Sequence, residues 1–236
     1  MSMGSLLYDT RIEIAPKIHL RNPLVGEILD FGEKQFWSAV TSFTSTSYDY
    51  MVELYDAGIK YEDISDFQLF CMFFDQIKSM DCSILFDDVD FTRFDLAVDH
   101  QNQNIVLWNQ RDDVVIDDAI FFYIAAKIRT LCGLKRVWYN MGNEAARSFF
   151  IDKERRKQRR RKNKPFESIL EREIIAMVNC AECKYNFETI RQCNLYQFNS
   201  SVAAIQHRVH FDKLMIGVYA GTVDIKNIDK KELTIF

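Results

Sequence analysis

The sequence predicts an α+β protein that is predominantly helical, with one β-hairpin in its first domain and a helical module after Pro165. Glycine and proline are scarce, at 8 and 3 of 236 residues, which favours long regular elements over a loop-rich all-β fold. The 19 Phe and 10 Tyr residues supply enough large apolar surface for a substantial core. Hydrophobic residues make up 48% and charged residues 27%, the balance of a folded globular chain rather than a disordered one.

Apolar spacing in the first part of the chain predicts strands followed by helices. Residues 11–20 (RIEIAPKIHL) alternate around Pro16 and predict two short strand pieces or an edge strand. Asn22 is expected to cap a helix that has Pro23 at its first position. Further helices are expected where apolar residues recur at helical spacing, around 36–43, 48–56 and 65–74.

The middle of the chain changes its periodicity twice. Residues 94–110 alternate and predict a β-hairpin with a polar turn at 100–104. An apolar helix then follows, with Asp117 as its expected N-cap and Gly133 as its stop. Asn143 is expected to cap the next helix.

Charge and hydropathy together suggest three parts. Residues 153–164 carry nine Lys or Arg and one Glu, although the net charge of the chain is −4. We expect an acidic α+β domain at 1–151, a basic helix extension or linker at 152–164, and a helical module at 165–236. The module should contain helices over 166–179 and 195–220, the second ending at Gly221.

Cysteine and histidine residues in the last part could suggest zinc. Cys180 and Cys183 form a CxxC pair, with Cys193, His207 and His210 further along. A structural zinc site needs four ligands that converge, and the chain has no second CxxC. We therefore expect ordinary reduced thiols, and no metal or other cofactor.

Aspartates cluster at 87–90 and 112–118, and paired carboxylates can hold Mg²⁺. No residue pattern of a nuclease, a phosphoryl-transfer enzyme or an EF-hand accompanies them. We expect these residues to be helix caps, turn residues and solvated faces, or to dock the basic segment. GxSxG, GxxxxGK[ST], GxGxxG and HExxH motifs are absent, so we expect a protein that is not an enzyme.

The basic segment has three possible interpretations. It could be a solvated helix extension, a contact for nucleic-acid phosphates, or a surface that docks an acidic protein face. The residues concerned in the second and third interpretations are Arg155, Arg156, Lys157, Arg159, Arg160, Arg161 and Lys162.

Five stretches, which cover about half of the chain, resemble proteins encoded in the structural-gene clusters of tailed phages and prophages of Gram-positive bacteria. They are KIHLRNPLVGEILDFGEKQF (17–36), IDDAIFFYIAAKIRTLCGLKR (116–136), GNEAARSFFIDKERRKQ (142–158), FESILEREIIAMVNCAECKYNFETI (166–190) and FNSSVAAIQHRVHFDKLMIGVYAGTVDIKNIDKKEL (198–233). The resemblance implies a tail assembly chaperone that binds the tape-measure protein or another tail protein. The resemblance also implies that the protein is located in the host cytoplasm or in the virion. A homo-oligomer is a further possible state.

A chaperone of this kind needs an apolar groove for amphipathic helices. Candidate groove residues are Phe36, Trp37, Phe43, Phe67, Phe70 and Phe74, although the same rings could simply form the core. The sequence has neither a membrane-length apolar run nor a signal-peptide pattern, so no membrane contact is expected.

Overall fold

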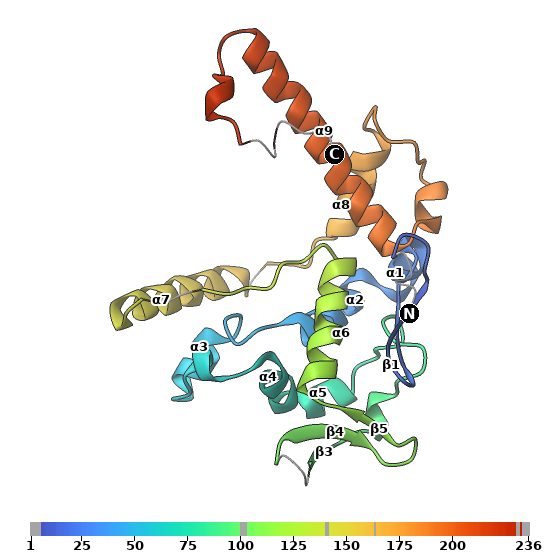
Figure 1. Ribbon diagram of the computed structural model, residues 1–236, viewed down its shortest axis with the longest axis vertical. Helices are drawn as coiled ribbons and strands as arrows, with labels where there is room; N and C mark the ends of the chain where they lie inside the picture. The colour runs from blue at the N-terminus through green and yellow to red at the C-terminus, as the bar shows by residue number, and fades with distance from the viewer. Residues whose placement is uncertain (1–5, 100–102, 140–141, 163, 230–231, 233–236) are drawn as a thin grey trace.

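The computed structural model describes residues 6–99, 103–139, 142–162, 164–229 and 232, and it confirms the predominantly helical α+β class (Figure 1). The strands are β1 (Arg11–Ala15), β2 (Ile18–Arg21), β3 (Asp95–Val98), β4 (Ile105–Asn109) and β5 (Val114–Ile116). The helices are α1 (Val25–Phe31), α2 (Glu33–Thr44), α3 (Met51–Asp56), α4 (Asp66–Met72), α5 (Phe74–Lys78), α6 (Asp118–Leu131), α7 (Glu144–Arg161), α8 (Ile169–Val178) and α9 (Leu195–Tyr219).

β1 and β2 pair antiparallel across a turn in which Lys17 adopts a φ of 65°, so the prediction of two short strand pieces is confirmed. The capping role predicted for Asn22 is wrong. Its buried side-chain amide donates to the carbonyl oxygens of Leu6 and Asp9, and it therefore ties down the preceding segment. Helix α1 begins only at Val25.

β3, β4 and β5 form an antiparallel sheet with β4 in the centre. The predicted hairpin is confirmed, although residues 100–102 of its predicted turn lie outside the described residues. The sequence predicts the end of a strand at residues 114–116, and the structure forms a separate strand there, β5. It spans three residues, and Asp113 turns the chain into it with a φ of 51°.

Aromatic rings from α2, α4 and α6 meet in the main core. The ring centroids of Phe43 and Phe70 lie 5.1 Å apart, and those of Phe70 and Phe121 lie 4.6 Å apart. The groove predicted from the aromatic residues is therefore wrong for its phenylalanines, because they fill the core instead. Phe36, Phe43, Phe67, Phe70 and Phe74 are all at most 3% exposed.

Trp37 is the sixth residue of that predicted groove, and it is only partly buried. Its indole N–H donates to the Glu33 carboxylate at 3.0 Å, and its ring contacts Phe36 edge to face. Trp37 therefore covers the outside of α2 and does not line a groove with the phenylalanines.

The main core continues across Pro165 into the last part of the chain. Leu170, Ile174 and Met177 of α8 and Leu195 and Phe198 of α9 belong to the same buried cluster as the helices of the first part. Backbone hydrogen bonds also join residues 23–25 to residues 193–195, at 2.8 and 2.9 Å. The segment from α8 to the start of α9 is thus anchored on the first 151 residues.

Beyond its first turns α9 leaves this body and projects outward (Figure 1). The chain then turns at Gly221, which has a φ of 72°, and the following residues fold back on the helix. The backbone N–H of Val223 donates to the Gly217 carbonyl, and a Cβ on Gly217 would lie 2.8 Å from the Val223 side chain. Within the described ranges no helix is both long and apolar enough to cross a membrane.

Candidate functional site

An apolar groove separates α8 from α9. Its floor and walls are Ala176 and Met177 of α8 with Val202, Ile205 and Val209 of α9, and its volume is about 410 Å³. Polar residues stand at its edges, among them Glu173, Gln206, His210 and Lys213. The groove therefore combines an apolar floor with a rim that carries both charge signs.

The groove arises from the spacing of apolar residues along α9. Phe198, Val202, Ile205, Val209 and Ile216 follow each other at intervals of three, four or seven residues, so they share one face of the helix. Phe198 is 1% exposed in the core, whereas Ile216 is 67% exposed. The apolar face therefore starts in the core and passes along the groove as far as Val209. Asp212 and Lys213 interrupt it, and Ile216 lies beyond them, exposed on the projecting part of α9.

We call this face, from Val202 to Ile216, the apolar track. A helix in water gains most of its stability from packing of its apolar face, and an unpacked one is marginal. The distal half of α9 also exposes Tyr219 by 82%. Apolar surface of this kind on a projecting helix is typical of an interaction site.

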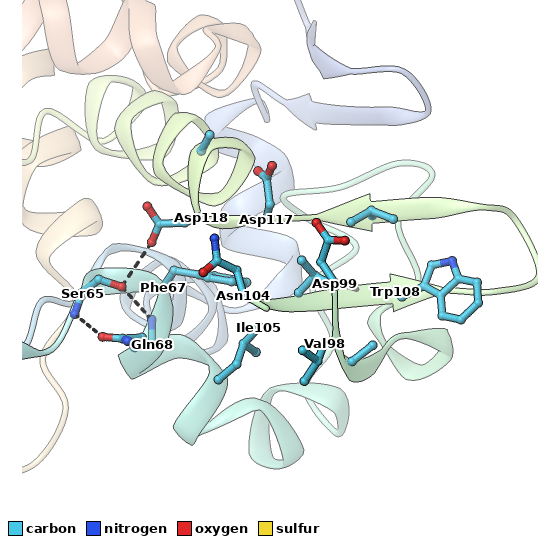
Figure 2. Close-up of a pocket in the computed structure, with 14 residues that line it drawn as sticks. Ser65, Phe67, Gln68, Val98, Asp99, Asn104, Ile105, Trp108, Asp117 and Asp118 are labelled. Atoms are coloured by element: carbon cyan, nitrogen blue, oxygen red, sulfur yellow. Dashed lines mark hydrogen bonds between the residues drawn. The ribbon is translucent and has the colours of Figure 1, made fainter. Parts of the chain in front are cut away.

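A larger cleft lies between the sheet and the starts of α4 and α6 (Figure 2). It has a volume of about 1110 Å³, and Val98, Ile105 and Trp108 give it an apolar side. Its polar side consists of helix caps. Ser65 accepts a hydrogen bond from the Gln68 N–H and donates to Asp118, and these contacts appear as dashed lines in the figure.

Asp117 also caps a helix, because its carboxylate accepts the Ile120 N–H at 2.8 Å. Asp99 and Asn104, from the two sides of the β3–β4 connection, also have partners. The cleft therefore combines an apolar wall with polar groups already engaged in local structure. The Ser65 hydroxyl, which contacts the Asp118 carboxylate at 3.1 Å, is itself engaged as the N-cap of α4.

The aspartate clusters serve as caps and ion-pair partners in the structure. Asp88 accepts hydrogen bonds from Arg11 at 2.8 Å and from the His19 ring at 2.7 Å. Asp90 caps the turn at Thr92, and this hydrogen bond lowers the pKa of Asp90. The cluster residues thus hold β1 and the turn before β3. Among the described residues, their ion pairs do not involve the basic segment.

The cysteines do not assemble a metal site. All six are free, and the described residues contain no group of three or more His, Cys, Asp or Glu side chains placed to hold a metal ion. Burial raises the pKa of the Cys82 and Cys132 thiols to about 12. A hydrogen bond to Glu182 is the main cause that raises the pKa of Cys180. None of these three thiols is therefore activated toward nucleophilic or metal-binding chemistry.

The basic segment forms the second half of α7, and the predicted cap of this helix is confirmed because Asn143 accepts the Ala146 N–H. One face of α7 packs on α3. Ile151 is 2% exposed in a small apolar cluster with residues of α3 and α4. Arg155 pairs with Asp56, and Gln158 donates to Glu53 at 3.0 Å. The segment is therefore a helix held along one side, with its other side in solvent.

Two buried carboxylates act as anchors between distant parts of the chain. Glu33 accepts the N–H groups of Ile169 and Leu170 at 3.0 and 2.9 Å, so α2 supplies a carboxylate to the start of α8. Asp66 accepts hydrogen bonds from Arg129 and Arg136 at 2.9–3.2 Å. Both sites are fully engaged inside the protein and serve its stability.

The phenylalanines predicted to line a groove on the first helices lie in the core, and the groove between α8 and α9 was not predicted. The apolar stripe of α9 was visible in the sequence as spacing within 198–209, but the sequence did not tell which part of that helix would be covered. The length of α9 is the signal that indicates an uncovered part, because the helix has 25 residues and the core can cover only its first turns.

Comparison with known proteins relates the last part of the chain to a family. A family model described as YomV second domain matches residues 168–233, which include α8, α9 and the groove between them. The YomV family is associated with phages and prophages, so the match fits a phage protein. No curated protein and no solved structure matches the chain.

Proposed function

We propose that this chain is a non-enzymatic phage morphogenesis protein, a tail assembly chaperone whose α8–α9 groove binds an amphipathic helix of the tape-measure protein. The match of residues 168–233 to a phage-associated family supports the phage setting. The groove lies within the matched residues, which supports an interaction role for this part of the chain. The tape-measure protein itself comes from the resemblance of the sequence to phage structural-cluster proteins.

The apolar track, half-buried from Val202 to Val209 and exposed at Ile216, is the observation that carries the proposal. From Val202 to Ile216 it extends for about 21 Å, at a rise of about 1.5 Å per helical residue. That length offers about four turns for a partner helix with anchors at i, i+3, i+4 and i+7. A chaperone that shields the apolar face of a long helix needs a surface of this shape.

The groove has the chemistry of a reversible protein contact. Its floor is apolar and its rim carries both charge signs, including Glu173 and Lys213. Burial, together with the charge of Glu33, raises the pKa of Glu173. An apolar centre with a polar rim is the usual anatomy of a protein interface.

Replacing Ile216 with glutamate is expected to weaken binding of the tape-measure protein by at least about tenfold, because a charge would stand in the apolar contact. The matched control is Ala203→Glu, which adds the same charge to an exposed position on the opposite face of α9. The proposal predicts a neighbouring gene that encodes a tape-measure protein. Each variant is co-expressed with the product of that gene, and the amount co-purified is measured. Circular dichroism verifies that both variants keep the helical content of the wild type.

The proposal fails if the wild-type chain does not retain the tape-measure protein. It also fails if Ile216→Glu and Ala203→Glu reduce retention equally, because the apolar track would then have no special part. Loss with the first variant alone supports the proposed site.

A further inference from the structure

The outer face of α7 carries a continuous row of cations. Five basic residues recur at intervals of three, one, three and one, which places them on one face of the helix. All five are exposed. We call this face the basic stripe, and it consists of Lys153, Arg156, Lys157, Arg160 and Arg161.

The opposite face of α7 fixes the direction in which the basic stripe points. Ile151 is buried against α3 and α4, and Arg155 and Gln158 bind Asp56 and Glu53 of α3. Along the sequence these residues alternate with those of the stripe, so around the helix they lie on the opposite side. Lys153, Arg156 and Arg160 therefore point away from α3, whereas Lys157 and Arg161 line a cleft beside residues 48–51. α7 extends outward from the body (Figure 1).

Like charges at this spacing repel one another and destabilise a helix. Glu154 offsets part of this repulsion through an ion pair with Lys157 at 2.7 Å. A polyanion lying along the stripe would relieve it further. We infer that the basic stripe binds the phosphate backbone of duplex nucleic acid without regard to sequence, a function beyond the proposed chaperone activity.

The composition of the stripe favours nucleic acid over an acidic protein surface. A specific protein interface needs an apolar centre, whereas α7 has no apolar residue after Ile151. Phosphate contacts need only cations, because binding is driven by release of counterions. The stripe also lacks aromatic rings for base stacking, which favours a duplex over a single strand.

The acidic body does not prevent this contact. A helix with its side chains is about 10–12 Å across, which exceeds the Debye length of about 8 Å at physiological ionic strength. Asp56 and Glu53, which lie behind α7, are already bound by Arg155 and Gln158. From Lys153 to Arg161 the stripe spans about 12 Å, a length over which a duplex presents about seven phosphates.

The test measures binding of the full chain to a fluorescent random-sequence duplex of about 30 base pairs, by anisotropy, from about 50 to about 200 mM salt. Five phosphate contacts predict a slope of log K against log salt of about −4.5. The variant Lys153→Gln/Arg156→Gln/Arg160→Gln should bind about 100-fold more weakly near 100 mM salt, with a slope closer to about −1.8.

A charge-matched control separates the stripe from the net charge. Lys60→Gln/Lys184→Gln/Lys226→Gln removes three exposed cations outside α7 and should keep wild-type binding and slope. The inference is overturned if the wild type does not bind duplex at about 50 mM salt. Equal losses in the two triple variants, or binding of polyglutamate without binding of duplex, also overturn it.

Ile216→Glu serves as a further variant in this test. It lies on α9, away from the basic stripe, and should bind duplex like the wild type. Failure of the chaperone proposal and failure of the nucleic-acid inference therefore give different results.

Discussion

Replacing Asp66 with alanine is expected to lower the free energy of unfolding by about 3–5 kcal/mol, the largest effect expected for any single carboxylate in this chain. The Asp66 side chain is 7% exposed and that of Arg129 is 6% exposed, and their N–O distance is 3.2 Å. Arg136 binds both oxygens of the same carboxylate. Without Asp66, the Arg129 guanidinium stays buried, and among the described residues the Thr44 carbonyl is left to accept from it.

Urea denaturation followed by circular dichroism measures this effect. Asp75→Ala is the matched control, because Asp75 is an exposed aspartate near the start of the next helix. The double variant Asp66→Ala/Arg129→Met should recover part of the loss, since it removes the uncompensated charge as well. If Asp66→Ala costs less than about 1 kcal/mol, the buried ion pair is not the anchor described here.

Replacing Glu33 with glutamine is expected to lower the free energy of unfolding by about 2 kcal/mol. Glu33 is 7% exposed, and it binds the Ser168 hydroxyl as well as the Ile169 and Leu170 N–H groups. An anion at a helix N-terminus is favourable, and a neutral amide loses this interaction together with the charge-assisted hydrogen bonds. Thermal unfolding measures the effect, with the exposed Glu188→Gln as the matched control.

The cost of Glu33→Gln should depend on pH. Burial alone would raise the pKa of Glu33, but hydrogen bonds from Ser168, Leu170, Trp37 and Ile169 outweigh it and hold the pKa below the ordinary value of 4.5. A lowered carboxyl pKa contributes stability that is fully present above about 4.5 and is lost as the pH falls through the folded-state pKa.

The stability difference between the wild type and Glu33→Gln should therefore be constant near neutral pH and shrink below about pH 4.5. Glu173 lies near Glu33, and the pKa of Glu173 is raised. Its contribution to the stability of the folded state therefore grows as the pH falls, opposite to that of Glu33. Repeating the comparison in a Glu173→Gln background removes that contribution. A difference that grows as the pH falls would contradict the assignment of Glu33 as the charged cap of α8.

Local signals in the sequence were sufficient to predict where individual helices begin and end. Asp117 and Asn143 cap α6 and α7 as predicted, and Gly133 and Gly221 adopt positive φ beyond the ends of α6 and α9. Each of these interactions joins residues that are close in the chain. Helix boundaries of this kind depend on local chemistry, and the sequence shows it directly.

Contacts between distant residues could not be predicted in this way. Glu33 and Ser168 are 135 residues apart, and nothing near either residue indicates the other. Periodicity likewise identified the apolar face of α2 around Phe36 and Phe43 but not what would cover it. α4 and α6 cover that face, whereas the distal track of α9 remains open.

Site-specific photo-crosslinking tests the central claim, that the apolar track of α9 holds a tape-measure helix, most directly. A benzophenone amino acid is placed at Ile216 on the track, or at Ala203 on the other face of α9, and the chain is irradiated with the co-expressed tape-measure protein. A crosslink is expected from position 216 into an amphipathic helix of the tape-measure protein, and none is expected from position 203. A crosslink from 203 alone, or no crosslink from either position, would contradict it.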